Sequence, residues 1–283
     1  MNEKNKIVGI IAIYKPQNGE LENIEKYLGD LDYCYLMDDS GEDNSKLFQP
    51  LIQKYSGKLE YVLNESNIGL CASVNRGFKR AENIEAGWAL VMNPDGTFDD
   101  GAIKIYRKYI KNNDISKVAI ICPTYNIDRN PRSAGVGTKE VKYADMTGCL
   151  YNIEILHELG YYDQNTYFYG LDTEYCMRVE KSGYKIIECS EAVLNHMPAE
   201  TRHLKLFGKT VFSYGFDKPV RYYYQFRTAK YIHNKYGFCK SDLFMAYKWL
   251  KVVLFFENKG EYFKMISKGK KDAKKGYYGV YKG

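Results

Sequence analysis

The sequence predicts an α/β protein with a mostly parallel sheet flanked by helices and a helical C-terminal extension. One observation is that apolar, strand-like runs alternate with amphipathic helical segments from residue 7 to residue 92. This alternation is typical of βαβ units, in which helices cover both faces of an open sheet. The other observation is a change from acidic to basic composition near residue 200. We therefore predict an α/β domain over residues 1–200 and a basic, aromatic-rich helical segment over residues 201–283.

The composition excludes several classes of protein. Of the 283 residues, 45% are hydrophobic and 27% are charged, which excludes wholesale disorder. No apolar run approaches the roughly 20 residues that a membrane-spanning helix needs. Residues 1–6 are too polar for a signal peptide. The seven cysteines are scattered and form no CxxC pair, so we do not expect a disulfide framework or a zinc knuckle. We expect instead a chain with reduced cysteines in the cytoplasm.

The first four predicted strands alternate with three predicted helices. Residues 7–14 are continuously apolar and end at Lys15-Pro16, which predicts a strand buried on both faces. Shorter apolar runs predict strands at 34–37, 59–63 and 88–92. Helical spacing of apolar residues predicts helices at 20–28, 45–55 and 71–81.

The middle of the chain is less regular. It predicts strands at 118–122, 184–187 and 192–194, a loop at 126–137, and helices at 152–159 and 172–182. Beyond Pro198 the pattern predicts helices and gives no strong strand signal. The Lys- and Gly-rich tail, residues 268–283, is predicted to be mobile.

Polar residues follow three of the predicted strands. Tyr14 ends the first strand, Asp38 and Asp39 follow the second, and Asn93 and Asp95 follow the fourth. In open α/β sheets ligands bind beyond the carboxyl ends of the strands, so these side chains are expected at one rim. No GxGxxG or GxxxxGK[ST] motif is present, which argues against a dinucleotide cofactor or a P-loop. A nucleotide could still bind through carboxylates, with a divalent cation neutralising its diphosphate.

Each acidic segment also has a structural interpretation. Residues 38–41 and 93–96 are rich in residues that favour turns. Two acidic turns at two strand ends of one βαβ array nevertheless favour a ligand-binding site over two unrelated turns.

A second polar cluster follows the predicted loops. Asp172 suits a helix cap, and Glu174 and Arg178 are spaced as an ordinary helix-surface pair. The functional interpretation makes one of these carboxylates a general base. His196 follows an apolar run and is either a structural histidine or, if it meets Asp95 in space, a metal ligand.

Taken in order, these residues resemble the inverting family 2 glycosyltransferases of the GT-A fold. Within that family the chain resembles the bacterial rhamnosyltransferase-like and galactofuranosyltransferase-like branch. The resemblance runs from about residue 7 to about residue 240. The matching stretches are 10–16, 36–40, 67–77, 92–95, 146–150, 160–163, 171–178, 183–184, 194–196 and 219–227.

The resemblance implies a role for each candidate residue. On the donor side it implies contacts with a nucleotide-sugar from Tyr14, Asp38, Asp39, Asn67, Asn75, Asn93 and Asp95. It makes Asp95 and His196 ligands of Mn²⁺ or Mg²⁺, and Asp172 the catalytic base. Thr147, Gly148 and Glu174 would lie on the acceptor side. Many relatives have two carboxylates where Asn93-Pro94-Asp95 offers one.

The resemblance also implies a biological setting. It favours dTDP-rhamnose as donor, ahead of UDP-galactofuranose or another UDP-hexose, with a lipid-linked or oligosaccharide acceptor in bacterial cell-surface polysaccharide synthesis. The competing hypothesis on the same fold is a non-catalytic module that binds nucleotide-sugars or glycans.

The charge of the C-terminal segment bears on its partners. Residues 201–283 have 19 Lys and Arg against 5 Asp and Glu, a formal charge of +14, with many interleaved Tyr and Phe. That pattern suits an anionic membrane surface, and so a peripheral location at the inner face of the plasma membrane. Nucleic acid is the competing partner, which we do not expect. A solvated helical face, or aromatic helices that pair two chains in a homodimer, would produce the same pattern.

Overall fold

The computed structural model describes residues 5–17 and 19–283. Residues 1–4, on which the signal-peptide argument partly rests, lie outside the described residues. Contacts divide the chain into two compact units, one of Met1–Tyr161 with Tyr175–Pro198 and one of Tyr162–Glu174 with Ala199–Gly283. The predicted division at residue 200 places the segment Tyr162–Glu174 in the N-terminal domain, whereas its contacts group it with the C-terminal residues.

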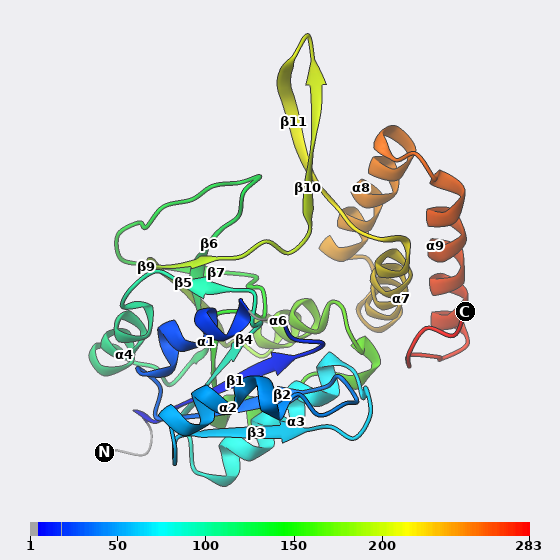
Figure 1. The fold of residues 1–283 in the computed structure, drawn as a ribbon. Coiled ribbons are helices and arrows are strands. Elements are labelled where there is room, and N and C mark those ends of the chain that lie inside the picture. The colour runs from blue at the N-terminus through cyan, green and yellow to red at the C-terminus, as the bar shows by residue number, and fades with distance from the viewer. Residues whose placement is uncertain (1–4, 18) are drawn as a thin grey trace. The chain divides into compact units, whose positions relative to one another are not determined.

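The first unit is built on a mixed sheet with the strand order β3-β2-β1-β4-β8-β6-β9-β5, and β7 pairs with β9 (Figure 1). Its first four strands, β1 (Ile7–Ile13), β2 (Tyr33–Asp38), β3 (Leu59–Leu63) and β4 (Trp88–Met92), are mutually parallel. They confirm the strands predicted there. The intervening helices are α1 (Glu20–Leu28), α2 (Ser45–Lys54) and α3 (Leu70–Asn83), also as predicted. α3 illustrates why the pattern predicted these helices. It buries one face, formed by residues at helical spacing: Cys71, Val74, Phe78 and Ala81.

The rest of the first unit adds elements that the sequence pattern did not reveal. The elements not predicted are β5 (Thr97–Phe98), α4 (Ala102–Asn112), β7 (Thr138–Val141) and β8 (Cys149–Asn152). Confirmed elements are β6 (Val118–Asn126), α5 (Ile153–Leu159) and α6 (Leu171–Lys181). Two short strands were expected, at 184–187 and 192–194, but β9 (Lys185–Asn195) is a single strand. Its pairing with β6 runs on both sides of an irregularity between Cys189 and Val193, and β7 pairs with it as far as Cys189.

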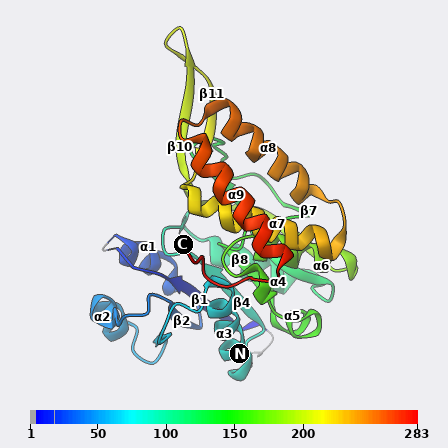
Figure 2. The same ribbon diagram turned by 90° about the vertical axis from the view of Figure 1, so that its right-hand side faces the viewer.

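The second unit combines a hairpin with three helices (Figure 2). Its elements are the 3₁₀ turn η2 (Gln164–Thr166), β10 (Glu200–Leu206), β11 (Lys209–Phe216), α7 (Pro219–Tyr236), α8 (Lys240–Phe255) and α9 (Lys259–Lys274). The expectation of helix without strands beyond Pro198 is wrong for 200–216, which form the β10–β11 hairpin. The hairpin escaped prediction because both strands are largely exposed, so no clean apolar alternation marks them.

Aromatic side chains fill the core of the second unit. Tyr222, Phe226, Val252, Phe256 and Tyr262 are among its buried residues. The predicted mobile tail is wrong for its first half, because α9 continues to Lys274. Beyond α9, the guanidinium of Arg227 donates to the carbonyls of Tyr278 and Gly279 and so ties the chain end to α7. Among the described residues, no helix has both the length and the apolar character to cross a bilayer.

Candidate functional site

The predicted rim forms at the carboxyl ends of β1 and β2. The backbone N–H of Lys15, just after β1, donates to Ser40 Oγ, just after β2, at 2.7 Å. This bond joins the segments that follow the two strands. Tyr14 is 52% exposed there, with the Lys15 ammonium 5.5 Å from its ring centroid, so a ligand can reach the ring.

Asp38 ends β2 and is fully buried. Its Oδ1 accepts from the Ser40 backbone N–H at 2.8 Å, and its Oδ2 accepts from Tyr61 Oη at 2.7 Å and Asn44 Nδ2 at 3.0 Å. A carboxylate has about four acceptor positions, so one remains for a further donor such as a ribose hydroxyl or a base N–H.

Asp39 holds the loop that precedes α3. Its carboxylate accepts from the backbone N–H groups of Ile68 and Gly69, each at 2.9 Å, and from Asn64 Nδ2 at 3.1 Å. Burial raises the pKa of Asp39, and these hydrogen bonds offset only part of that effect. Because the donors are neutral, the ionised carboxylate keeps a negative charge at the strand ends.

The two predicted asparagines lie on the same side of the first unit. The side-chain oxygen of Asn67 accepts from Gly69 N at 3.1 Å, next to the bond that Gly69 makes to Asp39. Asn75 is buried on α3, one turn after Cys71, with its amide 3.9 Å from the Cys71 sulfur. Asn67 thus shares the Asp39 loop, whereas Asn75 lies deeper in α3.

Asp95 and His196 come together although they are far apart in the sequence. β5 pairs antiparallel with β9, and Thr97 lies opposite Asn195. This register brings the segment after β4 to the end of β9, and His196 Nδ1 lies 3.5 Å from Asp95 Oδ1. The Asp95 side chain is 55% exposed, whereas that of His196 is 8% exposed. From the sequence, His196 is a candidate metal ligand only if it lies near Asp95, and the structure places the two side chains next to each other.

Thr147 and Gly148, which the sequence predicts on the acceptor side, lie beside this pair. Thr147 Oγ1 accepts from the Asn93 backbone N–H at 3.0 Å. Gly148 has φ of +82° and its N–H donates to Val91 O at 2.8 Å. A Cβ there would lie 3.0 Å from side-chain atoms of Leu194 on β9 and Pro123 on β6, so the tight packing and the positive φ both favour glycine. The structure thus brings together Asn93, Asp95, Thr147, Gly148 and His196.

The Asp95–His196 pair suits a divalent cation. His196 Nδ1 is buried and has no hydrogen-bond partner among the described residues, so no other contact competes with a cation for this nitrogen. Carboxylate and imidazole form a mixed O/N donor set that accommodates Mn²⁺ and, less favourably, Mg²⁺. The described residues contain no cluster of three or more His, Cys, Asp or Glu side chains with metal-binding geometry. The remaining ligands would have to come from a diphosphate and water.

Asp172 and Glu174 belong to the second unit. Both are in the first turn of α6, and Asp172 Oδ1 accepts from the Thr173 backbone N–H at 2.6 Å. Glu174 is fully buried, and its Oε1 accepts from Lys235 Nζ at 2.8 Å and Tyr236 Oη at 2.6 Å. The acceptor-side role of Glu174 stays a prediction, and the structure gives its carboxylate two partners on α7.

Several residues of the site were missed in the sequence. Asn64 directly follows β3, the same strand-end signal that marked Asp38, and would have been found by applying that signal to every strand. Tyr61 and Asn44 carry no such signal. Glu20, at the start of α1, has a raised pKa because burial disfavours its charge and the Asp95 carboxylate adds to the effect. Its position near Asp95 depends on the fold alone.

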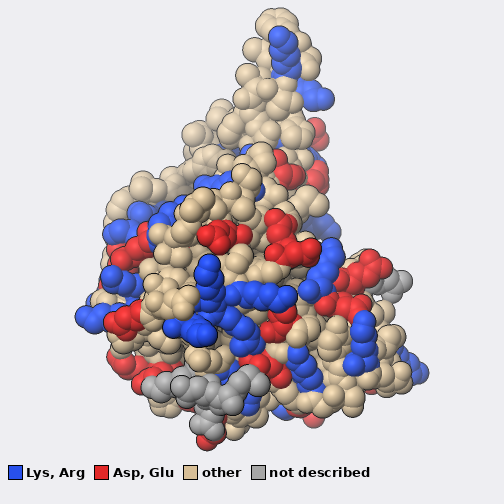
Figure 3. All heavy atoms as spheres, turned by 90° about the vertical axis from the view of Figure 1, so that its left-hand side faces the viewer, with Lys and Arg blue, Asp and Glu red and all other residues tan. Residues whose placement is uncertain are grey.

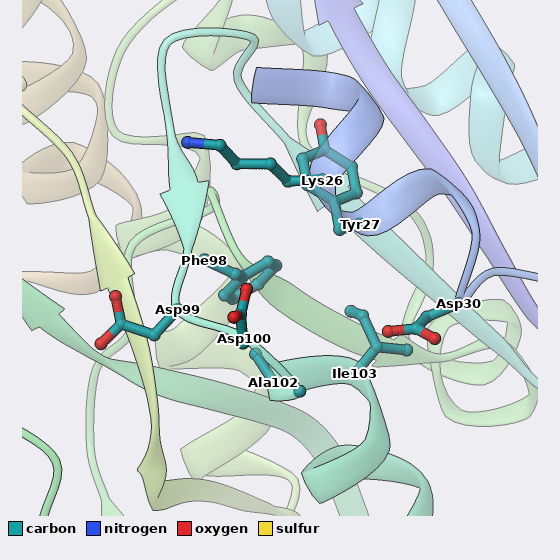
Figure 4. Close-up of a pocket in the computed structure, with 9 residues that line it drawn as sticks. Lys26, Tyr27, Asp30, Phe98, Asp99, Asp100, Ala102 and Ile103 are labelled. Atoms are coloured by element: carbon teal, nitrogen blue, oxygen red, sulfur yellow. The ribbon is translucent and has the colours of Figure 1, made fainter. Parts of the chain in front are cut away.

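A small hollow lies between α1 and the start of α4 (Figure 4). It has a volume of about 10 Å³ and is lined by residues of α1, β5 and the start of α4, including Tyr27, Phe98 and Asp100. That is room for about one water molecule. None of the predicted site residues lines it, so it is no candidate for a nucleotide site.

Comparisons with known proteins bear on the family and the fold of this chain. Residues 21–161, about half of the chain, match the family model described as Glycosyl transferase family 2. Among solved structures, the chain is similar to the crystal structure of GalNAc-T7 with UDP, GalNAc and Mn²⁺, with 12% sequence identity and a TM-score of 0.60. The similarity covers 95% of this chain but only 56% of that one. No curated protein matches the chain.

These findings define the class of protein. The likeness in structure confirms the predicted α/β class and the GT-A fold. The family match then identifies a family 2 glycosyltransferase domain in this chain, over residues 21–161.

Proposed function

We propose that this protein is a metal-dependent, inverting glycosyltransferase that moves a sugar from a nucleotide-diphosphate donor to a sugar hydroxyl of a glycan acceptor. The observation that carries the proposal is the Asp95–His196 pair beside Asn93 and Thr147, at the strand ends of a family 2 glycosyltransferase domain. In open α/β sheets this is the rim where ligands bind.

The proposed donor is dTDP-rhamnose, with UDP-galactofuranose or another UDP-hexose as the alternative. Asp38 and Asp39 would receive the base or ribose, because each has hydrogen-bonding capacity left after its protein partners. The GT-A structure solved with UDP, GalNAc and Mn²⁺ supports a nucleotide-sugar donor and a divalent cation by analogy of fold.

The proposed acceptor is a lipid-linked or oligosaccharide glycan in bacterial cell-surface polysaccharide synthesis. The basic charge of residues 201–283 supports a peripheral position at the cytoplasmic face of the plasma membrane, where such an acceptor is presented. A homodimer through the aromatic helices is the competing arrangement of this segment.

In the proposed reaction, Asp172 removes the proton from the acceptor hydroxyl as its oxygen attacks the anomeric carbon. The bond from that carbon to the diphosphate oxygen breaks on the opposite face, so the configuration inverts and a nucleoside diphosphate leaves. A cation bound by Asp95 and His196 would supply charge neutralisation for the diphosphate. Thr147 holds the Asn93 backbone through its hydroxyl and so fixes the turn that presents Asp95.

Ligand-dependent melting tests the donor site. We expect dTDP or UDP to raise the melting temperature, and Mn²⁺ to enlarge that rise, because a ligand of the folded state stabilises it by mass action. The nucleotide with the larger effect identifies the donor class. No shift at millimolar nucleotide would refute a nucleotide-sugar transferase.

The variant Asp172→Asn tests the catalytic base. We expect it to fold and bind nucleotide like the wild type but to transfer sugar about 10³-fold more slowly. Asp114→Asn, which changes an exposed loop carboxylate of the first unit, is the matched control and should transfer at the normal rate. Normal turnover by Asp172→Asn would remove Asp172 from this role. Nucleotide binding without transfer to any acceptor, in the wild type, would favour the non-catalytic binding module.

A further inference from the structure

Helix α8 presents several large apolar side chains to solvent and buries two lysines. Leu243, Tyr247, Leu250 and Leu254, spaced four, three and four residues apart on one face, are between 43% and 60% exposed. Lys248 and Lys251 of the same helix are only 5% and 4% exposed, and are buried together with Met245 and Val252. An ordinary surface helix of a globular protein has the reverse arrangement.

Polar contacts of the two buried lysines fix this orientation. Lys248 Nζ donates to Gln225 Oε1 at 2.7 Å and to Asp217 Oδ2 at 3.2 Å, and Lys251 Nζ donates to the Gly215 carbonyl at 2.5 Å. Rotating α8 to bury its leucines would remove these partners from Asp217 and Gln225, which are themselves buried. The outward apolar face is therefore a stable feature of the second unit.

The β10–β11 hairpin extends the same apolar surface. Phe212 of β11 lies with Tyr247, Leu250 and Leu254 of α8 around an open hollow of about 260 Å³. Leu204 of β10 lies opposite Phe212 in the hairpin register and is 43% exposed. Trp249 of α8 adds an indole that is 46% exposed. Trp and Tyr are the side chains enriched where protein meets the lipid headgroups.

The tip of the hairpin presents a phenylalanine to solvent. Phe207 is 96% exposed and has φ of +50°, next to Gly208 with φ of +75°. Two-residue hairpin turns of this kind favour Asn-Gly or Gly-Gly, and a bulky residue at positive φ is strained. Lys205 and Lys209 flank the turn, and Figure 3 shows basic side chains close to the tip.

We propose that Phe207, the exposed face of α8 and Phe212 form a docking surface for a bilayer that contains anionic phospholipid. The apolar side chains would enter the headgroup boundary, and the lysines would contact lipid phosphates. Charge decides between a bilayer and a second copy, because residues 201–283 have a formal charge of +14 and two such segments repel each other. The proposed function includes a membrane contact, and this surface names the residues that would make it. The inference rests on the proposed function only for the location at a membrane, because lipid binding requires no sugar transfer.

Vesicle flotation of the full chain tests this surface. We expect the protein to float with vesicles of phosphatidylglycerol and phosphatidylcholine, and much less with phosphatidylcholine alone or in high salt. Phe207→Ser and Leu250→Ser should each lower the partition coefficient about tenfold, by the loss of one inserted apolar side chain. Val136→Ser is the matched control, because Val136 is 95% exposed in the first unit.

Tryptophan fluorescence gives a second readout that leaves Phe207 and Leu250 intact. The chain has two tryptophans, and Trp88 is buried in the first unit. A blue shift on adding anionic vesicles should therefore come from Trp249 and vanish in Trp249→Phe. The proposal is overturned if the wild type does not float with anionic vesicles, or if Phe207→Ser and Leu250→Ser float as well as Val136→Ser. A stable dimer in light scattering that Leu250→Ser dissociates would also overturn it, in favour of a second copy.

These outcomes are separable from the proposed function. Transfer to a soluble acceptor should be unchanged in Phe207→Ser, because that residue is at the hairpin tip and outside the predicted site. Loss of flotation with normal transfer supports the surface, whereas loss of nucleotide binding in the wild type bears only on the reaction.

Discussion

Asp39 of the first unit and Asp217 of the second are both buried carboxylates, but they are held in different ways. The described residues supply Asp39 with neutral donors, two backbone N–H groups and an asparagine amide. Asp217 contacts the Lys248 ammonium and the Arg221 guanidinium, besides the amide of Gln225.

The pKa directions follow from these partners. Burial raises the pKa of Asp39, and its neutral donors offset only part of this rise. Burial also acts on Asp217, but Lys248 and the other donors outweigh it and lower the pKa of that carboxyl. The comparison teaches that a cationic partner stabilises the charged form of a buried carboxylate, whereas neutral donors leave burial as the larger effect on its pKa.

The largest expected effect comes from breaking the ion pair of the second unit. Lys248→Met would leave Asp217 buried without its main cation, which costs about 3 kcal/mol of unfolding free energy. Urea unfolding followed by the fluorescence of Trp249 measures this. Lys240→Met, at an exposed lysine of the same helix, should change stability by less than about 0.5 kcal/mol. Equal stability of the two variants would contradict the structural role of the pair.

Asp39→Asn tests the buried carboxylate of the first unit, which has neutral donors. The new amide can accept with one oxygen only, so one of the N–H groups of Ile68 and Gly69 would lose its partner, at about 2 kcal/mol. Nucleotide affinity should fall about tenfold or more as the charge and loop geometry are lost. Calorimetric titration with UDP or dTDP measures it, and unchanged affinity would show that Asp39 serves the loop alone.

A pH titration should show the pKa values of these two carboxyls displaced in opposite directions from the ordinary value of an aspartate. The folded pKa of Asp217 is lowered, so its contribution to stability is present above the unfolded value near 4 and is lost as the pH falls through the folded pKa. The folded pKa of Asp39 is raised, so acidification protonates it first in the folded state and favours folding. Carboxyl ¹³C NMR checks this, and a lower pKa for Asp39 than for Asp217 would reverse the comparison.

The smallest expected effect concerns a single hydroxyl. Tyr61→Phe removes the donor to Asp38 Oδ2 and should cost about 1 kcal/mol. Tyr14→Phe, at a half-exposed tyrosine, is the control and should leave stability unchanged. Thermal melting without ligand separates the two, and equal melting temperatures would mean that water replaces the lost bond.

The reliable predictions from sequence were those based on buried apolar runs. β1, β2, β3 and β4 were recognised because a parallel strand covered on both faces is apolar throughout. The β10–β11 hairpin was missed because its strands are exposed and carry no such signal. α4 was also missed, although it buries Ile103, Tyr106 and Ile110 at helical spacing.

The site was predictable to the extent that it follows strand ends. Asp38, Asp39, Asn93 and Asp95 were found from that rule. Asn64 follows β3 and was overlooked, whereas Tyr61 and Glu20 join the site through packing and leave no local pattern. The assignment of Tyr162–Glu174 to the second unit could not be predicted either, since it rests on contacts such as those of Lys235 with Asp163 and Glu174.

The sequence by itself determined the parallel sheet, its covering helices and the acidic residues at the strand ends, because these depend on periodicity and on neighbours in the chain. Only the tertiary structure decided that His196 meets Asp95, through the register of β5 on β9. It also decided which face of α8 is buried, because the partners of Lys248 come from α7 and from the residue after β11. Hydrophobic pattern specifies local elements, whereas the placement of a buried charge depends on partners that the fold brings from elsewhere in the chain.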